Sequence, residues 1–267
     1  MGGDLLFYIN KRQERLGEEK FNNQGCLMKI IEYNTAKDII VEFQDIYKGK
    51  VHTNYKNYRL GSVKNPYFPT VYGVGMCGNK YPTQYNNNDT REYITWHGML
   101  ERCFYEKRKI EYPTYKNAMC CDEWLNRDNF EEWLRCQINY DKFLNGNFAL
   151  DKDILFKGNK LYSPDTCCLV PEYVNTLFVK RDNDRGDLPI GVTKNGDNKF
   201  RARCNNPLIE NHEVHIGTFN TTEEAFYAYK KYKESLIKEI AEIEYIKRNI
   251  SKECYDAMMK YEVEITD

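Results

Sequence analysis

The stretch that decides the fold of the C-terminal part runs from Pro189 to Ala241 and reads PIGVTKNGDNKFRARCNNPLIENHEVHIGTFNTTEEAFYAYKKYKESLIKEIA. Turn-forming Asn, Gly and Pro residues separate three runs of strand-forming residues: Ile190–Lys194, Lys199–Cys204 and Glu213–Phe219. Thr221 with Glu224 then matches a capping box, which opens a helix. These patterns predict a three-stranded antiparallel sheet followed by a helix.

The predicted helix carries an apolar stripe at a spacing of three to four residues, which lets it lie across a small sheet. The stripe consists of Ala225, Phe226, Tyr229, either Tyr232 or Lys233, Leu236, Ile237 and Ile240. Successive residues of a strand point to opposite faces. The middle run therefore directs Phe200, Ala202 and Cys204 to one face, and Lys199, Arg201 and Arg203 to the other. A sheet with a helix on one face and arginines on the other suits a DNA groove.

This stretch resembles the APETALA2-type DNA-binding domain in the form carried by phage and mobile-element endonucleases. The resemblance rests on Gly191-Val192, Lys199–Arg203, Ile216–Phe219 and the helix TTEEAFYAYKKYKE, and it covers about 50 of the 267 residues. It implies that the sheet face contacts the major groove of double-stranded DNA through Thr193, Lys194, Lys199, Arg201, Arg203 and His215. The alternative is an ordinary small α+β module whose basic strand is simply solvated.

Composition limits the other possibilities. The chain has 267 residues, of which 41% are hydrophobic and 14% aromatic, so it has enough apolar matter for one large or two to three small domains. The net charge is −1. Because the chain is not basic as a whole, any affinity for nucleic acid must come from local patches.

One such patch lies near the N-terminus, between residues 47 and 66. The segment has no Asp or Glu, interleaves Tyr47, Tyr55 and Tyr58, and carries the basic residues Lys48, Lys50, Lys56, Arg59 and Lys64. We expect strands at Met28–Tyr33, Asp38–Phe43 and Lys50–Tyr58 around it. Basic side chains follow phosphates and tyrosines stack on bases, which predicts nucleic-acid binding. Alternatively, the tyrosines fill a strand face.

The central stretch LDKDILFKGNKLYSPDTCCLVPEYVN, residues 150–175, resembles the HNH-type endonucleases of phage proteins that carry an APETALA2-type domain downstream. The resemblance implies a β-hairpin followed by a helix around one divalent cation such as Mg²⁺. The first strand would be Leu150–Ile154, the hairpin would return at Asn159 to Asp165, and the helix would start at Val170 to Asn175. The implied metal ligands are Asp151, Asp153 and Asn175.

This motif departs from the family where the catalytic base should stand. The family has Asp-His, whereas this chain has Asp151-Lys152, and no His occurs between His97 and His212. The candidate catalytic residues are thus Asp151, Lys152, Asp153 and Asn175, and Lys152 would need a strongly depressed pKa to act as a base. The alternative is a ββα scaffold kept for DNA docking, with the two aspartates satisfied by local lysines.

The ten cysteines include no Cys-x-x-Cys pair, so we expect free buried thiols and no structural zinc. The sequence has neither a signal-peptide pattern nor an apolar run long enough to span a bilayer. We therefore expect a cytoplasmic protein without a membrane partner, in the host cytoplasm if a phage encodes it.

Together these patterns predict an α+β chain with a small N-terminal β module, a central HNH-like ββα core with flanking helices, and a C-terminal three-stranded antiparallel sheet plus helix. The expected segments are a lead-in at 1–27, the β module and linker at 28–87, the degenerate HNH-like core at 88–180, the APETALA2-type domain at 181–245, and a C-terminal helix with an acidic tail at 246–267. Three functions stay open. They are a homing-type HNH endonuclease, a non-catalytic DNA-binding regulator, and a phage inhibitor of a host defence system that binds protein. The oligomeric state is left open.

Overall fold

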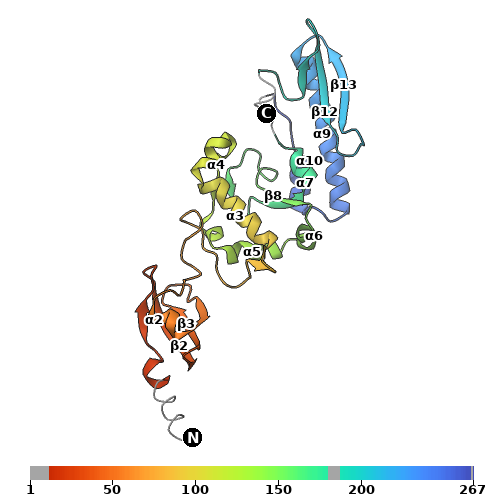
Figure 1. Ribbon diagram of the computed structural model, residues 1–267. Helices are drawn as coiled ribbons and strands as arrows, with labels where there is room; N and C mark the ends of the chain where they lie inside the picture. The colour runs from red at the N-terminus through yellow and green to blue at the C-terminus, as the bar shows by residue number, and fades with distance from the viewer. Residues whose placement is uncertain (1–11, 180–186, 266) are drawn as a thin grey trace. The chain divides into compact units, whose positions relative to one another are not determined.

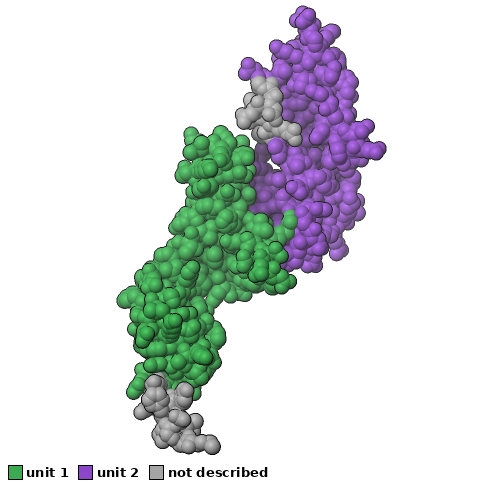
Figure 2. Space-filling view, in the orientation of Figure 1, with its two compact units in different colours: residues 1–116, 120–132 green, residues 117–119, 133–267 purple. Residues whose placement is uncertain are grey.

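The computed structural model describes residues 12–179, 187–265 and 267, and its fold is of the expected α+β class (Figure 1). The chain forms two compact units (Figure 2). Unit 1 comprises Met1–Lys116 and Cys120–Glu132, and unit 2 comprises Asn117–Met119 and Trp133–Asp267. Among the described residues, no helix combines the length and the apolar character that crossing a membrane requires.

Unit 1 begins with a four-stranded antiparallel sheet, which confirms the expected N-terminal β module. Its strands lie in sequence order: β1 (Glu19–Phe21), β2 (Leu27–Thr35), β3 (Asp38–Phe43) and β4 (Lys50–Thr53). Alternate residues of β3, namely Ile39, Val41 and Phe43, are buried. They pack with Met28, Ile30 and Tyr58 in a small core.

The expected strand Lys50–Tyr58 is wrong in its second half. The strand ends at Thr53, and a short helix, α2 (Tyr55–Arg59), follows. The carbonyl oxygen of the Asn54 side chain accepts a hydrogen bond from the Asn57 amide at 2.9 Å, which caps this helix at its N-terminus. Asn is a strong N-cap residue, and this local hydrogen bond competes with continuation of the strand.

The rest of unit 1 is mainly helical around a tryptophan pair. Its elements are the hairpin β5 (Gln84–Tyr85) and β6 (Asn88–Asp89), α3 (Arg91–Phe104), α4 (Glu106–Glu111), η1 (Pro113–Tyr115) and η2 (Asp122–Leu125). β7 (Met119–Cys120) and α5 (Arg127–Arg135) lie at the boundary with unit 2. Trp96 of α3 is fully buried, and its indole donates to the Trp124 carbonyl at 2.7 Å.

Unit 2 contains the expected ββα arrangement, with shifted boundaries. After α6 (Tyr140–Leu144), β8 (Phe148–Asp151) pairs antiparallel with β10 (Cys168–Pro171), and α7 (Glu172–Thr176) follows directly. The expected first strand Leu150–Ile154 was placed too late, since β8 ends at Asp151. The returning strand pairs only from Cys168, and the stretch 159–165 holds the short β9 (Leu161–Tyr162). The helix begins after Pro171 instead of at Val170, because Val170 and Pro171 still pair with Ala149 and Phe148 of β8.

The C-terminal part confirms the predicted order of three strands and a helix. β11 (Val192–Lys194), β12 (Phe200–Asn205) and β13 (Glu213–Phe219) form an antiparallel sheet with β12 in the middle. α9 (Thr222–Ile246) opens with the predicted capping box and is followed by α10 (Lys252–Met259). Both helices share one buried core with the sheet and with Val170 and Val174 of the ββα arrangement.

Candidate nucleic-acid interface

The C-terminal sheet has one face covered by α9 and one face open. Val192 of β11 and Ala202 and Cys204 of β12 are buried in a core with Ala225 and Tyr229 of α9. Because neighbouring residues of a strand alternate between faces, Arg201 and Arg203 lie on the face that α9 does not cover. We call this the outer face.

Strand register arranges the outer face in cross-strand rows. Thr193 lies opposite Arg201, and Arg201 lies opposite Thr218. In the next row, Arg203 lies opposite His215. A β-bulge separates the two rows, and its extra residue on β13 is Ile216, which packs against the core. The bulge keeps both His215 and Thr218 on the outer face.

The two predicted lysine contacts are placed differently. Lys194 lies opposite Phe200, a residue that packs against the core, so Lys194 belongs to the row of the helix-covered face. Lys199 precedes β12 and is exposed, and its amino group donates to the Asn220 side chain. Of the six predicted contacts, the sheet thus gathers Thr193, Arg201, Arg203 and His215 on one face.

Both arginines of the outer face have partners within the module. The Arg201 guanidinium donates to the Asn195 side-chain oxygen. Arg203 forms an ion pair with Glu213 at 3.0 Å, and both side chains are substantially exposed. An exposed pair of this kind contributes only about 0–1 kcal/mol to folding, so a phosphate or base edge can replace the carboxylate at small cost.

The five basic residues predicted near the N-terminus are all exposed. They are Lys48, Lys50, Lys56, Arg59 and Lys64. The amino group of Lys48 donates to Gln44 at 3.1 Å, and Lys50 lies 4.0 Å from Glu42. Lys56 and Arg59 lie three residues apart on α2. Their charges are available to a polyanion.

The tyrosines of the same segment are structural. Tyr58 is fully buried, and burial raises the pKa of its hydroxyl well above the ordinary value. Tyr55 packs edge-on against Tyr33 at 6.0 Å between ring centroids and lies 3.8 Å beneath the Arg15 guanidinium. Tyr47 stacks on Tyr67 at 4.8 Å. The tyrosines therefore contact other aromatic side chains of the protein, but they do not fill a strand face as the alternative expected, because Tyr55 and Tyr58 lie on α2. Binding by this segment rests on its charges.

Three of the four predicted catalytic residues, Asp151, Lys152 and Asp153, lie in a turn held by internal hydrogen bonds. Asp151 is buried, and its Oδ1 accepts hydrogen bonds from the amides of Asp153 and Ile154, each at 2.7 Å. Burial raises the pKa of Asp151, and these two amide hydrogen bonds oppose the rise. The amino group of Lys152 donates to the Asp153 carboxylate at 2.6 Å and to the Asn159 carbonyl at 3.0 Å. Asn175 is half-buried on α7.

These contacts leave few free oxygen atoms for a divalent cation such as Mg²⁺, which prefers several carboxylate or carbonyl ligands. Asp151 accepts hydrogen bonds from backbone amides. Asp153 forms an ion pair with the amino group of Lys152, which already supplies a positive charge. Across residues 12–179, 187–265 and 267, no three or more His, Cys, Asp or Glu side chains gather as a metal site. The predicted metal site stays a prediction, and the residues present do not fit it well.

None of the ten cysteines, all of which lie in the described part of the chain, forms a disulfide bond. The Sγ atoms of Cys168 and Cys254 lie 3.8 Å apart within the buried core of unit 2. Burial raises the pKa of Cys167 to about 12, so this thiol stays protonated near neutral pH.

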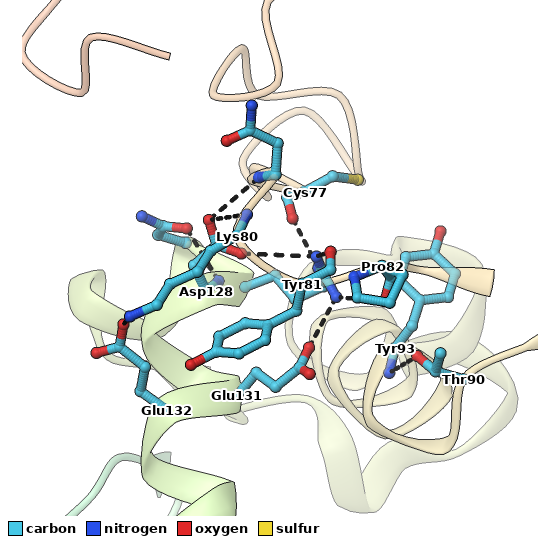
Figure 3. A network of polar contacts seen from close by, with 12 residues as sticks. Cys77, Lys80, Tyr81, Pro82, Thr90, Tyr93, Asp128, Glu131 and Glu132 are labelled. Atoms are coloured by element: carbon cyan, nitrogen blue, oxygen red, sulfur yellow. Dashed lines mark hydrogen bonds and ion pairs between the residues drawn. The ribbon is translucent and has the colours of Figure 1, made fainter. Parts of the chain in front are cut away.

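One polar network of unit 1 has no counterpart in the sequence analysis (Figure 3). Arg127 is fully buried, and its guanidinium donates to the Cys77, Tyr81 and Pro82 carbonyls and to Glu131 at 2.8 Å. Next to it, Asp128 Oδ2 accepts the Tyr67 hydroxyl at 2.9 Å and the amides of residues 79 and 80. The network fixes the loop 77–82 on α5. Its only signal in the sequence is the adjacent Arg-Asp pair, which is too common to predict burial.

Comparisons of the chain with models of protein families, with curated proteins and with solved structures found no match. The two resemblances therefore stay predictions, and the functional argument rests on the geometry described above.

Proposed function

We propose that this protein binds double-stranded DNA through the outer face of its C-terminal sheet. The observation that carries the proposal is the gathering of Arg201, Arg203, His215 and Thr193 on one face, while α9 seals the other. Phosphates and guanine edges both accept the paired donors of an arginine, and a narrow sheet of this kind can enter the major groove.

The charge distribution supports the same proposal. The net charge of −1 excludes adhesion to DNA by the molecule as a whole, so a local basic face has to supply the attraction. The exposed lysines and the arginine around α2 offer a second group of phosphate contacts. Two weak contacts in one chain bind more tightly than either alone, because the second forms at a high effective concentration.

We favour a binding role over catalysis. The internal contacts of Asp151 and Lys152 keep the turn in place and engage the groups that cleavage would need. Endonuclease activity is the second candidate, because β8, β10 and α7 have the expected ββα order and Asp153 is only half-buried. A third candidate, inhibition of a host defence protein, does not require the outer face to be basic.

Removing both outer-face arginines tests the binding proposal. Binding of fluorescein-labelled duplexes, first enriched from a random pool by the wild-type protein, is measured by anisotropy over a range of salt concentrations. Each lost phosphate contact lowers the slope of log K against log salt by about 0.9, so Arg201→Ala with Arg203→Ala lowers it by up to about 1.8. Lower affinity without a lower slope identifies the arginines as base contacts.

Two matched variants complete this test. Lys231→Ala with Lys238→Ala removes the same charge from exposed positions on α9 and should change binding little. Glu213→Gln removes the carboxylate beside Arg203 and should strengthen binding, because an acidic group repels phosphates. If the α9 pair weakens binding as much as the arginine pair does, the outer face is not the DNA contact.

A nicking assay with Mg²⁺ or Mn²⁺ on the same duplexes separates binding from cleavage. Asp153→Asn is the informative variant, since Asp153 is partly exposed whereas Asp151 holds the turn. Intact, bound DNA supports the binding role. Products that disappear with Asp153→Asn would establish a nuclease.

A further inference from the structure

A cavity of about 790 Å³ lies in unit 2 between α7, α9 and the segment that joins β12 to β13. Its apolar wall includes Phe148, Tyr173 and Leu177. Asn205, at the end of β12, and Thr176 of α7 add polar groups. The lining also contains charged side chains, among them Lys233 and Glu244. A concave site of this size that combines an apolar wall with polar groups is suited to a small molecule.

Lys233 of α9 lines this cavity and is unusual in its burial. Only 7% of the residue is exposed, and it lies on the buried stripe of α9 with Tyr229, Leu236 and Ile237. Among the described residues, none forms a hydrogen bond or an ion pair with its amino group. Burial lowers the pKa of Lys233, and the nearby Cys204 thiol opposes this effect. A buried ammonium without a carboxylate partner is costly.

The other buried charge of the cavity is already balanced. Glu244 is 1% exposed and accepts hydrogen bonds from Lys247 at 3.0 Å and from the Asn249 side chain at 2.7 Å. Glu172 and His212 also line the cavity, but both are exposed to solvent. The cavity therefore has one buried cation without a counter-ion.

We propose that this cavity binds a small organic monoanion, a carboxylate with an apolar or aromatic body. The carboxylate pairs with the Lys233 amino group, and the body lies against Tyr173 and Leu177. One uncompensated positive charge matches a carboxylate, which carries a single negative charge, better than a phosphate monoester, which carries nearly two. The site is distinct from the outer face, so this proposal does not depend on the proposed DNA binding.

The test uses three fluorinated probes that differ in charge, observed by ¹⁹F NMR with the full-length protein. 4-Fluorophenylacetate is the monoanion, 4-fluorophenylacetamide is its neutral counterpart, and 4-fluorophenyl phosphate carries nearly two charges. We expect saturable binding of 4-fluorophenylacetate and at least about tenfold weaker binding of the other two probes. Lys233→Met keeps an unbranched apolar stem and removes the amino group, and it should reduce binding of 4-fluorophenylacetate about tenfold while binding of the amide is unaffected.

Three outcomes would overturn the proposal. They are equal binding of 4-fluorophenylacetate and 4-fluorophenylacetamide, tighter binding of 4-fluorophenyl phosphate, and no saturable binding of 4-fluorophenylacetate up to about 10 mM. The comparison of probes uses the wild-type protein, so it stands even if Lys233→Met fails to fold. Unchanged binding of 4-fluorophenylacetate to a folded Lys233→Met protein would also exclude Lys233 as the counter-ion.

Discussion

Lys233 is buried, and burial is unfavourable for a charged residue such as lysine. The spacing along α9 left open whether Tyr232 or Lys233 completes the apolar stripe, and it is Lys233 that is buried. Tyr232 is half-buried, and its hydroxyl accepts a hydrogen bond from the Asn206 side chain at 2.9 Å. A lysine occupies a position where an apolar side chain would be more stable, which is expected if its charge has a use.

Replacement of this lysine should stabilise the fold. Lys233→Met removes a buried amino group and keeps the apolar stem, so we expect a gain on the order of 1 kcal/mol in the free energy of unfolding. The pKa of Lys233 in the folded protein lies below the ordinary value of 10.5. Below the folded pKa the cost of the buried charge is fully present. Between the folded pKa and the unfolded one, the unfolded chain binds more protons, so the wild-type protein gains stability as pH rises.

The advantage of Lys233→Met should therefore be largest at low pH and shrink as pH rises toward 10.5. Urea unfolding of both proteins at several pH values measures it. A gain that does not change with pH would show that the charge of Lys233 costs nothing in the folded state.

At the scale of elements, the contact between β11 and α9 depends on Gly191. This glycine has a φ of +76°, and a Cβ at this position would lie 2.1 Å from the Tyr229 ring. A side chain here would push the helix away from the sheet that it covers. The Gly191-Val192 pair is part of the resemblance to the APETALA2-type domain, and the structure provides a packing reason for it.

Gly191→Ala should destabilise the protein by about 2–4 kcal/mol, because the strain of the positive φ adds to the steric overlap with Tyr229. Gly196→Ala is the matched control, since Gly196 has a φ of +73° but nothing within 4 Å of its would-be Cβ. Its loss should be about 1 kcal/mol, from the backbone alone. Thermal and urea unfolding compare the two. Equal losses would mean that contact with Tyr229 does not set the helix position.

At the scale of the whole molecule, basic groups occur in both units. The outer face belongs to unit 2, whereas Lys56 and Arg59 of α2 belong to unit 1. If both contact one duplex, the affinity of the full chain combines two weak contacts through effective concentration.

Lys56→Ala with Arg59→Ala should then weaken DNA binding and lower the salt slope by up to about 1.8, as two lost phosphate contacts require. The melting temperature should hardly change, because both side chains are exposed. Lys37→Ala, at an exposed turn position between β2 and β3, is the control for unspecific loss of charge. An equal effect per charge at Lys37 would mean that the α2 residues have no special contact with DNA.

The sequence by itself determined the features that depend on neighbours along the chain. Local periodicity and turn chemistry predict the three C-terminal strands and the capping box of Thr221 and Glu224. They also predict that Arg201 and Arg203 lie on the other face of the sheet from the buried Ala202. The ββα order was expected from the resemblance of residues 150–175 to HNH-type endonucleases, and the structure has that order. Its boundaries were not predictable, because the strand end at Asp151 depends on hydrogen bonds to the two amides that follow.

Only the tertiary structure decided the features that depend on contacts between distant segments. It determines the burial of Tyr58 and the position of Arg127 beneath the loop 77–82. It also brought Lys233 to a cavity shared with α7. Burial and charge pairing of these side chains depend on which segments are in contact in the folded protein. The periodicity of a single segment does not predict those contacts.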